Sequence, residues 1–178
     1  MHLKKLLLFT FITVAFTGFV AAQQNRVDSI VAVLQKIDVS KAVDTTLFSS
    51  LNKILLEITL DDAAVASLEK ASEKLLVGNN SYWNYLVRRS IMNSLTVTDK
   101  AKAIAYGKRT YESLLTGKTL LAINIRSYFL RQLRIPYRTS VMLDDGFAYF
   151  NEKLKAFQLK NDSLGLADCY YVLGGFYR

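Results

Sequence analysis

The stretch Asn161-Asp-Ser-Leu-Gly-Leu-Ala-Asp-Cys-Tyr-Tyr-Val-Leu-Gly-Gly-Phe-Tyr-Arg178 decides the fold that we expect for this chain. Its apolar residues recur every three or four positions, which places their side chains on one face of an α-helix. They are Leu164, Ala167, Tyr170, Leu173, Gly174 and Tyr177. Asn161-Asp162-Ser163 supplies the short polar side chains that cap a helix start. The stretch therefore predicts a capped helix with a single apolar stripe.

The same helical pattern runs through most of the chain. A single proline and only eight glycines in 178 residues argue against turn-rich β structure. Apolar stripes at helical spacing occupy residues 25–37, 47–58, 63–76, 81–95, 99–106, 119–135 and 144–154. Asp44-Thr45-Thr46 offers an N-cap for the second of these, and Pro136 marks the end of the helix over 119–135. We expect one all-α domain.

One motif resembles a known repeat. Tyr170-x-x-Leu173-Gly174-x-x-Tyr177 resembles the tetratricopeptide signature of aromatic-x-x-Leu-Gly-x-x-Tyr. The resemblance implies a right-handed solenoid of antiparallel helix pairs, in which Gly174 lets a neighbouring backbone approach. Its units are about 44–78, 79–117, 118–160 and an incomplete 161–178, preceded by a leading helix within 23–43. First helices then start near residues 45, 81, 119 and 163, a spacing somewhat longer than the standard repeat of about 34 residues.

The N-terminal residues 1–22 have the organisation of a secretory signal peptide. Lys4-Lys5 precede an apolar run from Leu6 to Phe16, and the small residues of Val20-Ala21-Ala22 form a cleavage site that would leave Gln23 first. The alternative is an uncleaved anchor, but Leu6 to Ala22 is shorter than the roughly 20 residues of a membrane span. The signal peptide predicts export, and the lone cysteine, Cys169, cannot form a disulfide within the chain. An exported protein without disulfides fits a bacterial periplasm better than it fits a small extracellular scaffold.

The order of these segments has a wider resemblance. A signal peptide, a short leading helix, an Asp-Thr-Thr start and long repeats resemble the exported N-terminal region of Bacteroidetes repeat-bearing signalling proteins. That resemblance implies a protein-binding module, the periplasmic sensing part of a larger protein tethered to the membrane through a missing C-terminal segment. Two alternatives stay open. One is the N-terminal fragment of a sensor histidine kinase or other signalling enzyme whose catalytic domain is missing, and the other is a free-standing periplasmic scaffold.

The residue inventory predicts recognition and not catalysis. The only histidine, His2, lies within residues 1–22, so a Ser-His-Asp, Cys-His or His-metal site is not expected in this segment. We therefore expect no catalytic residues, no cofactor and no metal. Gly117-Lys118-Thr119 has the ending of a phosphate-binding loop, but Glu112 stands where that loop needs glycine. The net charge of +8 would favour nucleic acid, which export argues against.

The informative polar residues are basic. Arginines occupy two of the expected first helices, at positions 88, 89, 126, 131, 134 and 138. The repeat resemblance implies that stacked first helices line a concave groove, where Asn84, Arg88 and Arg131 would face a partner. Convergent arginines suit a protein or peptide partner that is acidic or ends in a free carboxylate. The alternative is an ordinary solvated face.

Overall fold

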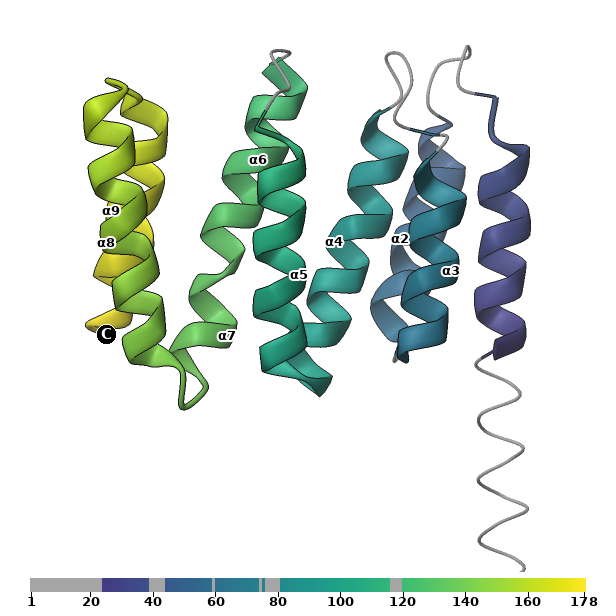
Figure 1. Ribbon diagram of the computed structural model, residues 1–178. Coiled ribbons are helices and arrows are strands. Elements are labelled where there is room, and N and C mark those ends of the chain that lie inside the picture. Colours follow the sequence, from purple (N-terminus) through teal and green to yellow (C-terminus); the bar gives the residue numbers. More distant parts are fainter. Residues whose placement is uncertain (1–23, 39–43, 59, 74, 76–80, 116–119) are drawn as a thin grey trace, which may run out of the picture. The chain divides into compact units, whose positions relative to one another are not determined.

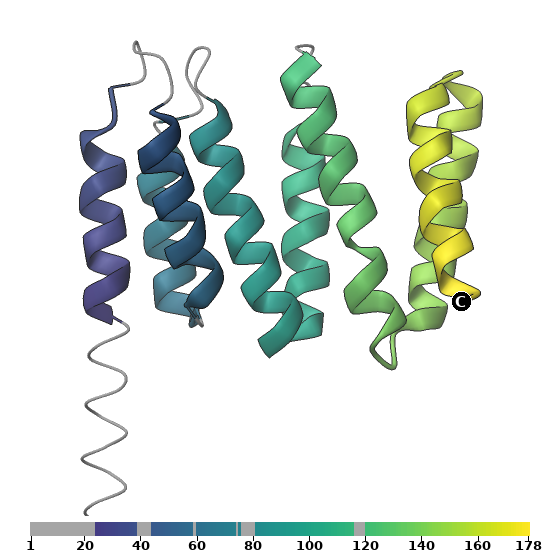
Figure 2. The ribbon, with the colours of Figure 1, turned by 180° about the vertical axis from the view of Figure 1, so that it is seen from behind.

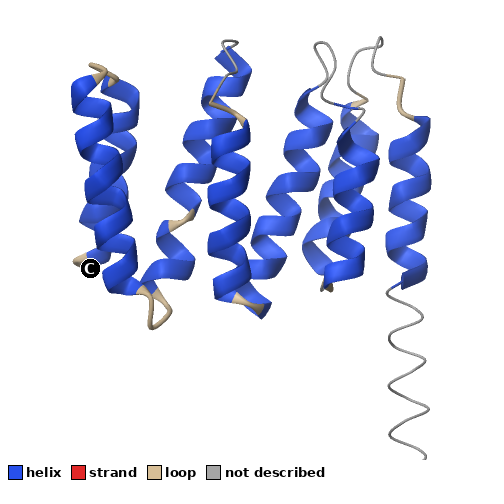
Figure 3. Cartoon of the chain, viewed as in Figure 1, coloured by secondary structure: helices blue, strands red, loops and turns tan. Residues whose placement is uncertain are grey.

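The computed structural model describes residues 24–38, 44–58, 60–73, 75, 81–115 and 120–178. Each regular element within these ranges is a helix, and Figure 3 draws none of them as a strand. The all-α class predicted from the sequence is confirmed. The predicted signal peptide and Gly117-Lys118-Thr119 lie outside the described residues. The chain divides into two compact units, Met1–Trp83 and Asn84–Arg178, which are described separately below.

The first unit contains a helix over residues 24–36, followed by α2 (Thr45–Glu57) and α3 (Asp62–Glu73) (Figure 1). The predicted cap of α2 is confirmed, because the Asp44 carboxylate accepts hydrogen bonds from the backbone N–H groups of Thr46 and Leu47, at 2.9 and 3.0 Å. Each helix buries one apolar stripe. The buried residues are Val27, Ile30 and Leu34, then Leu51 and Leu55, then Ala64, Leu68 and Ala71.

The helix α4 (Ser81–Thr98) begins at the end of the first unit and continues into the second. The second unit goes on with α5, α6, α7, α8 and α9, which span Lys100–Ser113, Leu120–Gln132, Arg134–Arg138, Leu143–Leu159 and Ser163–Phe176. Asp99 caps α5 by accepting from the backbone N–H of Lys102, and Asp162 caps α9 by accepting from that of Gly165. Both caps are local features of the sequence.

Neighbouring helices in the second unit alternate in direction. The start of α5 reaches the end of α7, where the Lys100 ammonium donates to the backbone carbonyl of Thr139, so α5 runs antiparallel to α6 and α7. The helices α8 and α9 form an antiparallel hairpin (Figure 1). The helices α6 and α9 run parallel. Arg126 on α6 contacts Asp162, the N-cap of α9, and Arg131, further along α6, contacts Asp168, further along α9.

Within this unit the helices form two layers. Figure 2 shows α6, α7 and α9 toward the viewer, whereas α5 and α8 lie toward the viewer in Figure 1. The packed interior between them is aromatic. Tyr137, Phe150 and Phe176 contact one another edge to face, with ring centroids 5.9 to 6.3 Å apart. These rings place α7, α8 and α9 around one core.

The end predicted for the helix over 119–135 is wrong by one turn. The helix α6 stops at Gln132, and a short helix, α7, carries Pro136 inside it. Proline has no N–H to donate to the carbonyl four residues earlier, and its ring clashes with that carbonyl. The carbonyl concerned is that of Gln132, so the ladder breaks there and restarts with the bond from Tyr137 N–H to Leu133 O, at 3.3 Å.

The repeat units expected from the sequence stay a prediction, and the helices are distributed over them as follows. The pair α2 and α3 lies within 44–78, α4 and α5 within 79–117, and α6 to α8 within 118–160. In the second unit α6 and α9 are parallel, and α8 and α9 are antiparallel. The tetratricopeptide-like solenoid over the whole of residues 44–178 stays a prediction.

Candidate binding surfaces

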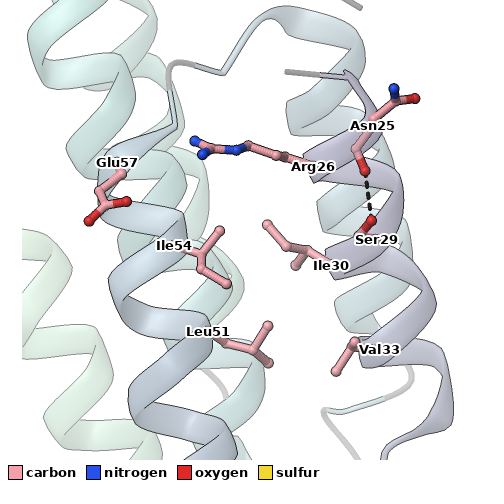
Figure 4. Close-up of a pocket in the computed structure, with 8 residues that line it drawn as sticks. All are labelled: Asn25, Arg26, Ser29, Ile30, Val33, Leu51, Ile54 and Glu57. Atoms are coloured by element: carbon pink, nitrogen blue, oxygen red, sulfur yellow. Dashed lines mark hydrogen bonds between the residues drawn. The ribbon is translucent and has the colours of Figure 1, made fainter. Parts of the chain in front are cut away.

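An open groove lies between the helix of residues 24–36 and α2 in the first unit. Its larger cavity has a volume of about 380 Å³ (Figure 4). The apolar lining comes from both helices, with Ile30 and Val33 on one side and Leu51 and Ile54 on the other. The volume falls in the range of about 300–1,000 Å³ that is typical of small-ligand sites. The amphipathic pattern of two successive helices thus leaves a hollow with an apolar floor.

The rim of this cavity carries one positive and one negative side chain from different helices. Figure 4 shows the Arg26 guanidinium extending across the mouth toward the Glu57 carboxylate. Among the described residues, neither group has an ion-pair partner. The Ser29 hydroxyl is occupied, because it donates to the backbone carbonyl of Asn25 at 2.8 Å. The free charges at the mouth are therefore those of Arg26 and Glu57.

A second cavity of about 330 Å³ adjoins the first through Val33, which lines both. Its other lining residues are Lys36, Ile37, Asp38, Asp44, Leu47 and Trp83. The Asp44 carboxylate already accepts two backbone hydrogen bonds as the cap of α2. This end of the groove consequently offers a ligand fewer free polar groups than the end beside Arg26.

In the second unit, the structure locates two of the residues predicted to face a partner. Asn84 is only 3% exposed, so it has little surface for a ligand. Arg88 is half-buried and turns toward α5, where its guanidinium donates to the Ser113 hydroxyl at 3.3 Å. Both side chains had been expected to face a partner. In the structure Asn84 is buried, and Arg88 contacts α5.

The adjacent residue Arg89 occupies the side that had been expected for Arg88. It lies beside the hydroxyls of Tyr85 on α4 and Tyr128 on α6, whose rings meet edge to face with centroids 5.3 Å apart. Burial raises the pKa of Tyr128 to about 12, and the nearby Arg89 charge opposes that shift. Arg89 is therefore the α4 arginine on the α6 side.

Arg131, the third predicted residue, lies at a junction of α6, α7 and α9. Its guanidinium Nε is 3.3 Å from the Asp168 carboxylate, and 47% of its side chain remains exposed. The same guanidinium lies 5.8 Å from the centre of the Tyr171 ring, and that of Arg134 lies 4.9 Å from it. Two arginines thus flank one half-exposed tyrosine, in the range of cation–π contact.

Asp168 holds Arg131 in place from beneath. Its side chain is only 7% exposed, and burial raises its pKa, while the neighbouring Ser127 and Arg131 act in the opposite direction. The charge-assisted contact with this buried carboxylate restrains the Arg131 side chain. Arg131 therefore has a defined orientation although half of its side chain meets solvent.

These residues form two clusters that share the helix α6, one around Tyr128 and one around Tyr171, and we name the whole set the arginine–tyrosine face. It consists of Tyr85, Arg89, Tyr128, Arg131, Arg134 and Tyr171. Of these residues, the sequence predicted a binding role for Arg131 and for none of the tyrosines. The sequence spacing could have indicated part of this surface. Tyr85 and Arg89 are four residues apart, and Tyr128 and Arg131 are three apart, so each pair lies on one helix face.

The repeat-signature residues of α9 lie mainly on its outer side. Tyr170 is 57% exposed and Tyr177 is 81% exposed, while Leu173 is half-buried. The close approach expected at Gly174 occurs one residue later. No atom lies within 4 Å of a Cβ built at Gly174, whereas one built at Gly175 would overlap the Arg134 side chain. Adjacent helix residues point about 100° apart, so α9 meets α7 through Gly175.

The lone cysteine is a poor nucleophile. Cys169 is fully buried, and burial, with Asp168 nearby, raises its pKa to about 12. At neutral pH its sulfur is a protonated thiol, and the thiolate is the reactive form. Within the described ranges, no group of three His, Cys, Asp or Glu side chains is arranged to hold a metal ion.

Fold and surfaces together define an all-α protein with two features suited to binding, the groove beside Arg26 and the arginine–tyrosine face. None of the helices described here is both long and apolar enough to cross a bilayer. No family model, no curated protein and no solved structure matches the chain.

Proposed function

We propose that this protein is a recognition module that binds an acidic segment of a partner protein on the arginine–tyrosine face. The observation that carries the proposal is the exposed junction of Arg131, Arg134 and Tyr171 on three helices. Arginine and tyrosine are enriched in protein interfaces, where they supply much of the binding energy. Half-exposed guanidinium groups in fixed positions give charge-assisted hydrogen bonds to carboxylates.

The shape of the surface favours a polypeptide over a small anion. The side chains of the arginine–tyrosine face come from four helices, α4, α6, α7 and α9, so its charges do not converge from a single helix. A partner with several acidic residues would contact two or more arginines and stack against Tyr171 at once. Preorganised contacts of this kind lower the entropy lost on binding.

Within this proposal the protein is exported through residues 1–22 and acts in the periplasm as the sensing part of a signalling protein. The support is the resemblance of its signal sequence and repeats to exported signalling proteins. N-terminal sequencing of the protein recovered from an exporting host should give Gln23 as the first residue. Recovery with Met1 still attached, in the membrane fraction, would favour an anchor instead.

Neutralising two arginines should weaken the binding of an acidic peptide. We choose Arg89→Gln with Arg134→Gln, because this pair leaves the Arg131–Asp168 contact intact. Hydrogen bonds to charged groups contribute about 1.5–3 kcal/mol each, so the double variant should bind a labelled Glu/Leu-rich peptide at least about tenfold more weakly in fluorescence anisotropy. The wild-type affinity should also fall as salt is raised.

The matched control removes two exposed positive charges, Lys155 on α8 and Lys160 at its C-cap. Lys155→Gln with Lys160→Gln has the same net charge as the arginine pair and should bind almost as well as the wild type. Equal losses in the two double variants would indicate only a diffuse positive surface. Wild-type binding of a Lys/Leu-rich peptide as tight as that of the Glu/Leu-rich peptide would also contradict the proposal.

Two adjacent glycines test the position of Arg134 separately. Alanine at Gly175 would meet the Arg134 Cδ at 2.2 Å, so the Arg134 side chain must shift, whereas alanine at Gly174 meets nothing within 4 Å. Gly174→Ala should raise the free energy of unfolding by about 0.5–1 kcal/mol through helix propensity. Gly175→Ala should lower peptide affinity and Gly174→Ala should not. Anisotropy and urea titrations measure both, and an unchanged affinity in Gly175→Ala would remove Arg134 from the site.

A further inference from the structure

We infer that the cavity between the helix of residues 24–36 and α2 binds a small zwitterion, a free amino acid with a large apolar side chain. The inference uses only residues of the first unit and does not depend on the arginine–tyrosine face. It rests on the apolar lining, the cavity volume of about 380 Å³ and the two unlike charges at the mouth.

The charges at the mouth select the class of ligand. Arg26 suits a carboxylate, and Glu57 suits an ammonium group. A fatty acid would place its carboxylate near Glu57 as well, and an alkylamine would place its ammonium near Arg26. A ligand that carries both charges can satisfy both groups (Figure 4). Opposite charges within the same small molecule therefore match this rim better than a single charge does.

The lining beneath the rim selects the side chain. Ile30 and Leu51 are buried, and Val33 and Ile54 are partly exposed, so the floor offers apolar contact on two sides. Burying an apolar side chain there gains about 25 cal/mol for each Å² removed from water. The charged ends of the ligand would stay at the solvent-facing mouth, where the loss of hydration is small. Leucine or phenylalanine meets both conditions.

The neighbouring cavity is the less suitable of the two. Its carboxylate at Asp44 is occupied by the cap of α2, and Asp38 has interactions of its own. Arg26 and Glu57 have no such partners among the described residues. The ligand should accordingly lie at the end of the groove beside Asn25 and Arg26.

Isothermal titration of the purified protein with L-leucine and L-phenylalanine tests the inference. Both should bind in a saturable way, whereas glycine, which lacks the apolar side chain, should not. Arg26→Met and Glu57→Gln should each weaken binding about three- to fivefold, the size of effect expected for one solvent-facing charge pair. The control is Lys53→Met, which removes an exposed charge from α2 outside the cavity lining and should leave binding unchanged.

Two derivatives of leucine distinguish the roles of the charges. N-acetyl-leucine has no ammonium group, so it should bind the wild type poorly. Its affinity should not fall further in the Glu57→Gln variant. Leucinamide has no carboxylate and should show the corresponding pattern with Arg26→Met. The inference is overturned if no amino acid binds, if all variants bind alike, or if octanoate binds as well as leucine and is indifferent to Glu57→Gln.

Discussion

Replacing Phe150 with alanine should lower the free energy of unfolding by about 3–5 kcal/mol. Phe150 is completely buried in the second unit, where its ring contacts Tyr137 from α7, Phe176 from α9 and the adjacent Tyr149. The truncation removes apolar burial and leaves a cavity that three aromatic side chains cannot fill without leaving their positions. The loss should appear as a lower urea midpoint in far-UV circular dichroism.

Leu159 provides the matched control for this experiment. It lies on the same helix, α8, but is 87% exposed. Leu159→Ala should change the free energy of unfolding by no more than about 0.5 kcal/mol, the range of most surface substitutions. Losses of similar size for Phe150→Ala and Leu159→Ala would mean that the aromatic cluster does not form the core of this unit.

The local parts of the fold were predictable from the sequence. Helices and their caps depend on residues within one turn, so the starts at Asp44, Asp99 and Asp162 followed from the position of an aspartate before an apolar stripe. The all-α class followed for the same reason. The helix end near Pro136 was wrong because the effect of a proline falls on the carbonyl one turn earlier.

The contacts between helices were less predictable. Helical spacing shows which residues share a face, but not which neighbour that face meets. Arg88 was predicted to face a partner, but the packing of α4 turns Arg88 toward Ser113 and Arg89 toward Tyr128. In the same way, Gly174 matched the repeat signature while Gly175 carries the close contact.

The two candidate sites differ in how much the sequence could indicate. Arg131 was predicted to face a partner because arginines cluster in that region, yet its contact with Asp168 depends on the packing of α6 against α9. Arg26 and Glu57 stand 31 positions apart in the sequence and were not identified at all. No short motif joins them, since one comes from each wall of a groove that exists only when the helices pack.

Replacing Trp83 with alanine should cost about 3–5 kcal/mol of stability in the first unit. Trp83 is 2% exposed, and its ring lies 5.4 Å from that of Phe48 on α2. It also forms part of the wall of the cavity of about 330 Å³, so its removal would enlarge a hollow that already exists. The side chains around the enlarged cavity can relax only partly, so most of the van der Waals contacts of the Trp83 ring are lost.

The measurement needs care because Trp83 is the only tryptophan of the chain. Fluorescence can report its buried environment in the wild type but cannot follow the variant, so both should be unfolded in urea and followed by circular dichroism. Tyr82→Ala is the control, since Tyr82 is the preceding residue of α4 and is 49% exposed. A loss below about 1 kcal/mol for Trp83→Ala, or one no larger than that of Tyr82→Ala, would place Trp83 at the surface. That result would make its ring available as a ligand contact in the groove of the first unit.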